Sequence, residues 1–109
     1  MMSSDDAYTG TVEQHFEDAC RDGVRRCNAL GYNPSYFARM LDEYGAVDTA
    51  RRLITANSPS EGFSRLWELG HLELSVEAIV LKEPFTSLFT QRELRMARRR
   101  LEDLGYFGS

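Results

Sequence analysis

Apolar residues recur every three or four positions through most of the 109-residue chain, which is the spacing of one face of an α-helix. The clearest stripe predicts a helix over residues 12–30, and another predicts a helix over residues 91–104. Shorter stripes, bounded by glycine or proline, lie at residues 34–44, 46–56, 59–69 and 76–81. No segment alternates long enough to predict a strand. The pattern therefore predicts an all-α fold, a compact single domain of five or six short helices with helical-hairpin connections.

Polar residues before these stripes are suited to cap the helices. Thr11 and Thr90 each precede a glutamate or glutamine by two to three positions, as in a capping box. Ser75 is placed to cap the helix over residues 76–81. Two prolines suggest further starts, with Asn33 capping before Pro34 and Ser58 capping before Pro59, because proline suits the first helical position.

The segment from Ser58 to Leu81 contains the only tryptophan, Trp67, which shares a predicted apolar face with Phe63 and Leu66. We therefore expect the Trp67 helix to lie at the centre of the domain. Gly23, inside the first predicted helix, would allow another helix to approach closely. We expect the Trp67 helix to lie against the first helix at Gly23 and against the last helix at Ala97 and Leu101.

Charge is unevenly distributed along the chain, although the formal net charge is only −4. Residues 1–20 contain five acidic and no basic residues, whereas residues 90–109 contain five arginines and three acidic residues. The negative total argues against a general binder of nucleic acids or anionic membranes. We interpret residues 1–10 as a flexible polar leader and residues 11–109 as the single helical domain. With no secretory signal and no transmembrane run, we expect no membrane partner and a cytoplasmic location.

The two cysteines, Cys20 and Cys27, are seven positions apart on one helical stripe. Along a helix this separation is about 10 Å, too far for a disulfide. We expect both to be reduced and buried.

No catalytic or metal motif is found: CxxC, HExxH, GxGxxG and the phosphate-loop pattern are all missing. The sequence therefore predicts no enzyme activity, no catalytic residue, no metal ligand and no cofactor. One alternative is acid–base chemistry at His71, which lies near Glu68 and Glu73. An exposed histidine in a connector is the commoner explanation.

Three places are candidates for binding a partner. Arg92, Arg95 and Arg99 share one side of the last predicted helix and would suit phosphates or an acidic protein. Alternatively this side is simply solvated, with Arg98 paired to Glu102 and Arg99 to Asp103.

The other two candidates lie earlier in the chain. His71 and Glu73 lie in the connector between Gly70 and Ser75, whose composition folding alone does not explain. Tyr36 belongs to a surplus of aromatic residues near helix ends, which suits protein recognition if some of them are exposed.

Several segments resemble an uncharacterised family of small bacterial helical proteins. The matching pieces are Gly31–Pro34, Tyr44–Val47, Gly62–Glu68, Leu74–Ala78 and Leu88–Thr90. The resemblance covers about residues 21–106. It implies a portable, self-contained bacterial helical module, and because the family has no established activity it implies no catalytic residue.

The sequence thus favours a non-enzymatic binding or adaptor module that recognises a protein partner. The alternative is a nucleic-acid-binding accessory domain that uses the arginine side of the last helix. A third hypothesis is a homo-oligomer, because the two ends of the chain carry opposite charge.

Overall fold

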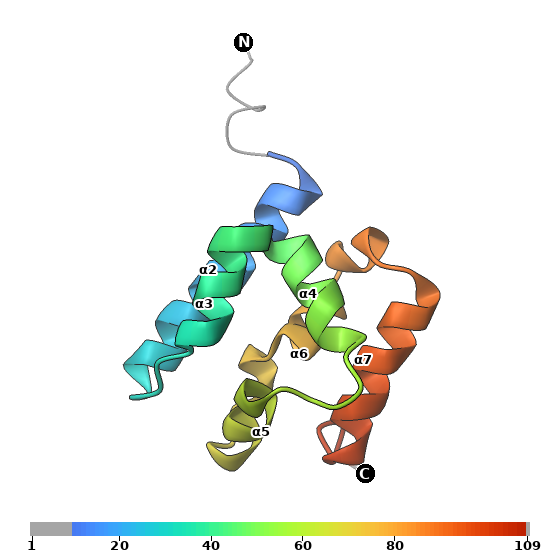
Figure 1. Ribbon diagram of the computed structural model, residues 1–109. Helices are drawn as coiled ribbons and strands as arrows, with labels where there is room; N and C mark the ends of the chain where they lie inside the picture. The colour runs from blue at the N-terminus through green and yellow to red at the C-terminus, as the bar shows by residue number, and fades with distance from the viewer. Residues whose placement is uncertain (1–9, 109) are drawn as a thin grey trace.

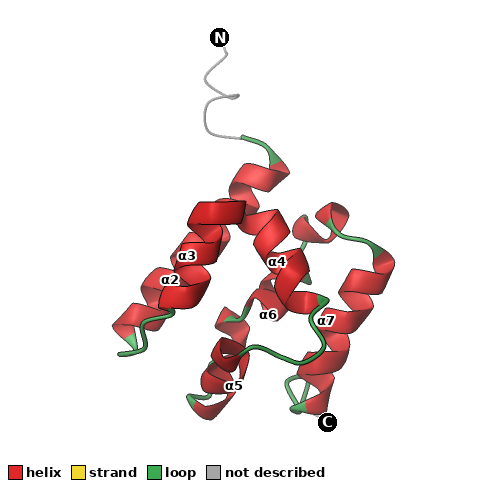
Figure 2. Ribbon diagram, viewed as in Figure 1, coloured by secondary structure: helices red, strands yellow, loops and turns green. Residues whose placement is uncertain are grey.

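The computed structural model describes residues 10–108, which form α-helices, two short 3-10 turns and no strand (Figures 1 and 2). This confirms the predicted all-α fold in one compact domain. The leader proposed at residues 1–10 lies outside the described residues except for Gly10. The helices are α2 (Val12–Ala29), α3 (Ser35–Tyr44), α4 (Ala46–Ile54), α5 (Glu61–Glu68), α6 (Val76–Val80) and α7 (Gln91–Asp103), with 3-10 turns η1 (Leu72–Leu74) and η2 (Phe85–Leu88).

Three of the predicted caps are confirmed. The side chain of Thr11 accepts a hydrogen bond from the amide of Gln14, and Ser75 accepts one from Ala78. Thr90 and Glu93 form the complete capping box at the start of α7. These caps act within three residues, so local sequence is sufficient to predict them.

The two proline-based starts are wrong by one or two positions. Helix α3 begins at Ser35, with Pro34 itself in the cap position and no side-chain hydrogen bond there. Helix α5 begins at Glu61, and its cap is Ser60 rather than Ser58. The side chain of Ser60 accepts a hydrogen bond from the amide of Phe63, so a serine two positions after Ser58 provides the cap.

Helix α6 lies in the interior, although it has only five residues, and all five are buried. It packs against α7, α4 and α2. Arg21 of α2 forms an ion pair of 2.8 Å with Asp42 of α3, which joins these two helices. Gly45, with φ of 80°, forms the whole connection between α3 and α4, a tight turn that favours glycine.

Buried apolar side chains form two clusters. The first cluster centres on Phe16, whose ring packs edge-on against Phe85 and Phe89 with centroids 5.3 and 5.4 Å away. Its buried members are Phe16, Cys20, Leu41, Ala46, Ala50, Ile54, Val76, Ile79, Val80, Phe89 and Ala97. The second cluster consists of Cys27, Phe63, Leu66, Leu72, Ala78 and Leu101.

The central placement of Trp67 is wrong, since its side chain is 51% exposed. Phe63 and Leu66 are the buried residues of α5, and at 100° per residue Trp67 lies about 70° from the midpoint between them. The centre is instead occupied by α6. Periodicity correctly predicted this helix. Which of its apolar side chains face the core depends on the helices that pack against it.

Gly23 is buried, and another element does approach it, but that element is not α5. A Cβ atom at Gly23 would lie 3.6 Å from the carbonyl oxygen of Leu74 and 3.7 Å from Cδ1 of Ile79. The neighbours are therefore η1 and α6. Within the described residues, no helix is long and apolar enough to cross a membrane.

Candidate functional site

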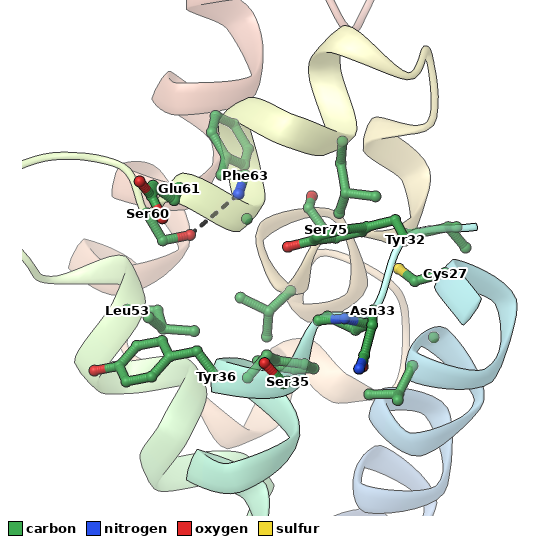
Figure 3. Close-up of a pocket in the computed structure, with 18 of the residues that line it drawn as sticks. Cys27, Tyr32, Asn33, Ser35, Tyr36, Leu53, Ser60, Glu61, Phe63 and Ser75 are labelled. Atoms are coloured by element: carbon green, nitrogen blue, oxygen red, sulfur yellow. Dashed lines mark hydrogen bonds between the residues drawn. The ribbon is translucent and has the colours of Figure 1, made fainter. Parts of the chain in front are cut away.

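A cavity of about 490 Å³ opens between five helices, α2 to α6. Residues from the second half of α2, the α2–α3 connection, α3, Leu53 of α4, α5 and Ser75 surround one space (Figure 3). The first turns of α3, α5 and α6 all begin at this cavity. Its volume lies within the usual range for ligand sites in proteins.

The walls of the cavity are mostly apolar and aromatic. Tyr32 lies across the cavity, and a Cβ atom at Gly62 would be 3.1 Å from its hydroxyl oxygen. The larger apolar and aromatic side chains of the wall are Val24, Tyr32, Tyr36, Phe37, Leu53, Phe63, Leu66, Leu74 and Val76. A largely apolar wall of this kind is suited to hold an apolar group of a ligand or partner.

The three helix starts at the cavity differ in how their first amides are satisfied. Ser60 caps α5 through the amide of Phe63 at 3.1 Å, drawn as a dashed line in Figure 3. Ser75 caps α6. Helix α3 has no side-chain cap, and the amides of Tyr36 and Phe37 donate no hydrogen bond within the described residues. These two donors are therefore available to an acceptor.

Glu77 lines the cavity and is 2% exposed. Its Oε2 lies 3.5 Å from Nη1 of Arg100, yet that oxygen accepts no hydrogen bond within the described part of the chain. Burial raises the pKa of Glu77 above its ordinary value, and this effect outweighs the opposing attraction of Arg100. A buried carboxyl group that is incompletely hydrogen-bonded is uncommon in native proteins and calls for a reason.

Arg100 is held in place by backbone oxygens rather than by solvent. Its guanidinium donates to the carbonyl oxygens of Leu53, at 2.7 Å, and of Ala56. It thereby ties the segment after α4 to α7. These acceptors come from 44 and 47 positions earlier in the chain, so the local sequence around Arg100 does not predict them.

Tyr36 is the one predicted partner-binding residue that lines the cavity. It is 62% exposed, the largest exposure among the large apolar and aromatic residues described. The guanidinium of Arg39 lies 5.9 Å from its ring centroid. An exposed tyrosine beside an apolar cavity is a common feature of protein-binding surfaces.

His71 and Glu73 form a pair, with Nδ1 and Oε2 2.8 Å apart. Slight burial alone would raise the pKa of Glu73, but the hydrogen bond with His71 lowers it below its ordinary value. Neither residue is among those that line the cavity. This predicted pair therefore lies outside the cavity lining to which Tyr36 belongs.

The arginine side of α7 is exposed. Arg99 lies 3.8 Å from Asp103, as predicted, whereas Arg92 and Arg95 form no ion pair within residues 10–108. The predicted pair between Arg98 and Glu102 is not formed among the described contacts. Instead the guanidinium of Arg98 lies over the ring of Phe107, at 5.2 Å from its centroid.

Both cysteines are free and buried, as predicted. Burial raises the pKa of Cys20 to about 12, and burial also raises the pKa of Cys27. Cys27 lines the cavity and Cys20 does not. In the described part of the chain, no three histidine, cysteine or acidic side chains gather as a metal site.

Sequence reasoning missed the cavity, Glu77 and Arg100. One signal was present, because Glu77 is the single charged residue in the apolar run from Val76 to Leu81. A glutamate inside such a run is expected to be buried beside a partner. The partner and the empty space could not be inferred from it. Comparison of the chain with family models, curated proteins and solved structures finds no match.

Proposed function

We propose that this domain is a non-enzymatic module that binds a protein partner at the cavity, with Tyr36 at the edge of the contact. The observation that supports this proposal is the cavity of about 490 Å³, which has largely apolar walls and a tyrosine that is 62% exposed. Partner residues that contribute most to affinity commonly insert an aromatic or aliphatic side chain into such a pocket.

The reduced state of the cysteines supports a location for this module. Cys20 and Cys27 are unpaired, which suits a reducing compartment such as the bacterial cytoplasm. We propose that the partner is encountered there.

The proposal is tested by capture from a lysate of the host with the full chain and two variants. We expect the Tyr36→Ala variant to lose the partner, with its dissociation constant raised about tenfold or more. The matched control is Tyr44→Ala, because Tyr44 is also exposed but does not line this cavity and instead lies under Arg52. A partner bound equally by both variants, or recovered by neither the variants nor the parent chain, would contradict the proposal.

A second candidate is nucleic-acid binding by the arginine side of α7, favoured by Arg92 and Arg95, which are exposed and form no ion pair with the residues that the structure describes. Its affinity should fall steeply with added salt, because phosphate contacts release counterions. Binding of duplex and single-stranded oligonucleotides is measured across a salt series for the parent and for Arg95→Gln. The control is Arg25→Gln, which removes an exposed arginine of α2 that pairs with Asp22. Lack of binding at low salt would reject this candidate.

A further inference from the structure

We propose that residues 56–69, which comprise α5 and most of the connection before it, form a lid at the cavity, and that Arg100 of α7 is the latch that keeps this lid closed. The proposal rests on the proposed function only in taking the cavity as the place where the partner binds. It assigns to α5 a movement that admits the partner, with Gly70 as the hinge.

The start of α5 forms one wall of the cavity. Ser60, Glu61 and Phe63 lie on one side of the space in Figure 3. Ser35 and Tyr36, at the start of α3, lie on another side. The last two residues of α5 are not part of the lining. A tilt of α5 about its far end would therefore widen the cavity without moving the other walls.

Helix α5 is attached to the domain less extensively than α6. It packs mainly against η1, the turn that follows it, whereas α6 packs against α2, α4, α7 and both 3-10 turns. Phe63 and Leu66 are its buried residues, and both belong to the second cluster and line the cavity. Segments with few tertiary contacts open at a lower free energy than the whole domain unfolds. We therefore expect α5 to move before α6 or α7 does.

The two ends of the lid are suited to this movement in different ways. Gly70 has φ of 77°, and no atom beyond its neighbours in the chain lies within 4 Å of the position that a Cβ atom would take. A glycine at the end of a helix can absorb a change in backbone angles. At the other end, residues 55–59 are exposed. Within residues 10–108, the bond from Arg100 to Ala56 is the one hydrogen bond that joins residues 56–59 to another element.

Arg100 is placed to act as the latch. Its side chain is 11% exposed, and its guanidinium donates to the carbonyl oxygens of Leu53, at 2.7 Å, and of Ala56. Leu53 belongs to α4 and Ala56 to the lid, so the two bonds fix the point at which the lid leaves α4. Loss of both bonds would leave residues 56–59 free to extend and α5 free to tilt.

Glu77 offers Arg100 a second arrangement. Its Oε2 is buried, lies 3.5 Å from Nη1 of Arg100 and accepts no hydrogen bond in the described structure. In the closed lid the guanidinium is directed to the two carbonyl oxygens instead. When the lid opens, the guanidinium can move the short distance to Glu77 and form a charge-assisted hydrogen bond with it. This bond partly replaces the two that are lost at the latch, which lowers the free energy of opening.

The rate at which a small thiol reagent labels Cys27 measures how often the lid opens. Cys27 is 3% exposed and shares the second cluster with Phe63 and Leu66 of the lid, whereas Cys20 belongs to the first cluster. The full chain is labelled at one pH in increasing urea below its unfolding transition, and mass spectrometry gives both rates. We expect the Cys27 rate to depend less steeply on urea than the Cys20 rate, because lid opening exposes less surface than complete unfolding.

Substitution of Arg100 tests the latch. Arg100→Met keeps the aliphatic stem and loses both carbonyl bonds. Cys27 labelling should then rise at least about tenfold relative to Cys20 labelling, because hydrogen bonds from a charged group are strong ones. Arg98→Met is the matched control, since Arg98 is an exposed arginine of the same helix whose side chain donates no hydrogen bond within residues 10–108. This control should label like the parent.

Two further variants separate the latch from the buried pair. Arg100→Met leaves the carboxyl group of Glu77 without its cationic neighbour, so the double variant Arg100→Met, Glu77→Gln is measured as well and should show the same rise. Glu77→Gln by itself keeps both carbonyl bonds and weakens the alternative contact, so it should not speed the labelling of Cys27. Should neither Arg100 variant fold, the urea comparison in the parent decides the proposal.

The outcomes that would overturn the proposal do not involve the partner. They are an equal urea dependence of Cys27 and Cys20 in the parent, an unchanged Cys27 rate or an equal rise of both rates in the Arg100 variants, and a similar rise in Arg98→Met. Any of these together with loss of the partner by Tyr36→Ala would leave the proposed function standing on a rigid cavity. Conversely, a lid that opens as expected, with a partner that ignores Tyr36→Ala, would reject the proposed function alone.

Discussion

The two apolar clusters of this domain differ in how completely they are filled. Of the eleven buried members of the first cluster only Val76 lines the cavity, whereas Cys27, Phe63 and Leu66 do so among the six of the second. Phe16 is fully buried between two other phenylalanines, whereas Phe63, at 3% exposure, borders the cavity. The first cluster is therefore enclosed by the fold, whereas the second borders the cavity at which we propose that a partner binds.

The two buried glutamates show the same difference. Glu93 accepts hydrogen bonds from Nε of Arg51 and from the amide of Thr90, at 2.8 and 2.9 Å. Glu77, at the cavity, has an oxygen without a hydrogen bond. The carboxylate of Glu93 is thus satisfied within the fold, whereas that of Glu77 is not fully satisfied.

The largest expected effect comes from truncating one phenylalanine in each cluster. Phe16→Ala should lower the free energy of unfolding by about 3–5 kcal/mol, because it empties a site filled on all sides. Phe63→Ala should cost about 1 kcal/mol less, because its ring already lacks neighbours on the cavity side. Urea unfolding of both variants measures the difference. Equal losses would mean that the second cluster is as tightly packed as the first.

The next effect is the reactivity of the two cysteines toward a small thiol reagent at pH 9. With a pKa of about 12, about one thousandth of the Cys20 thiol is ionised at that pH. Cys27 lines the cavity, so we expect it to react at least about tenfold faster. Mass spectrometry of the labelled peptides measures both rates in one sample, and Cys27→Ser serves as the control. Faster labelling of Cys20 would contradict the assignment of the two regions.

A smaller effect is expected at Trp67, which belongs to α5 but points away from the second cluster. Trp67→Ala should cost about 1 kcal/mol or less, because half of the side chain is already in water. Thermal unfolding monitored by circular dichroism tests this value. A loss as large as that of Phe16→Ala would show that Trp67 is central after all.

The smallest expected effect is on the pH dependence of stability. Because the pKa of Glu77 is raised in the folded state, the unfolded chain loses this proton first as the pH rises above about 4.5. Its contribution to stability is therefore complete below the unfolded pKa and declines as the pH rises through the folded pKa. The parent should lose stability relative to Glu77→Gln as the pH rises from about 4.5, as measured by urea unfolding. A difference that stays constant, or grows in favour of the parent, would contradict this.

The sequence was most informative where structure depends on near neighbours. The capping residues Thr11, Ser75 and Thr90 are correct, because each hydrogen bond spans three positions. The helix starts predicted from Pro34 and Pro59 are wrong by one or two positions. A proline indicates that a helix begins nearby, but it does not identify the capping residue.

The candidate site was predicted only in part. Tyr36 lines the cavity, whereas His71 and Arg95 lie outside its lining. Spacing showed which residues were polar or aromatic near helix ends, but it could not show which ends meet. The helices α3, α5 and α6 begin at the same cavity because of the conformations of the connections that precede them.

By itself, the sequence determined that this chain is helical, where most helices begin and end, and which residues are apolar enough to be buried. These properties follow from periodicity and from hydrogen bonds a few positions long. Only the tertiary structure decided that α6 is central and Trp67 peripheral, and that Glu77 lies between Arg100 and an open cavity. The reason is that burial, charge pairing and cavities depend on contacts between residues that are distant in the chain. A local sequence pattern does not predict those contacts.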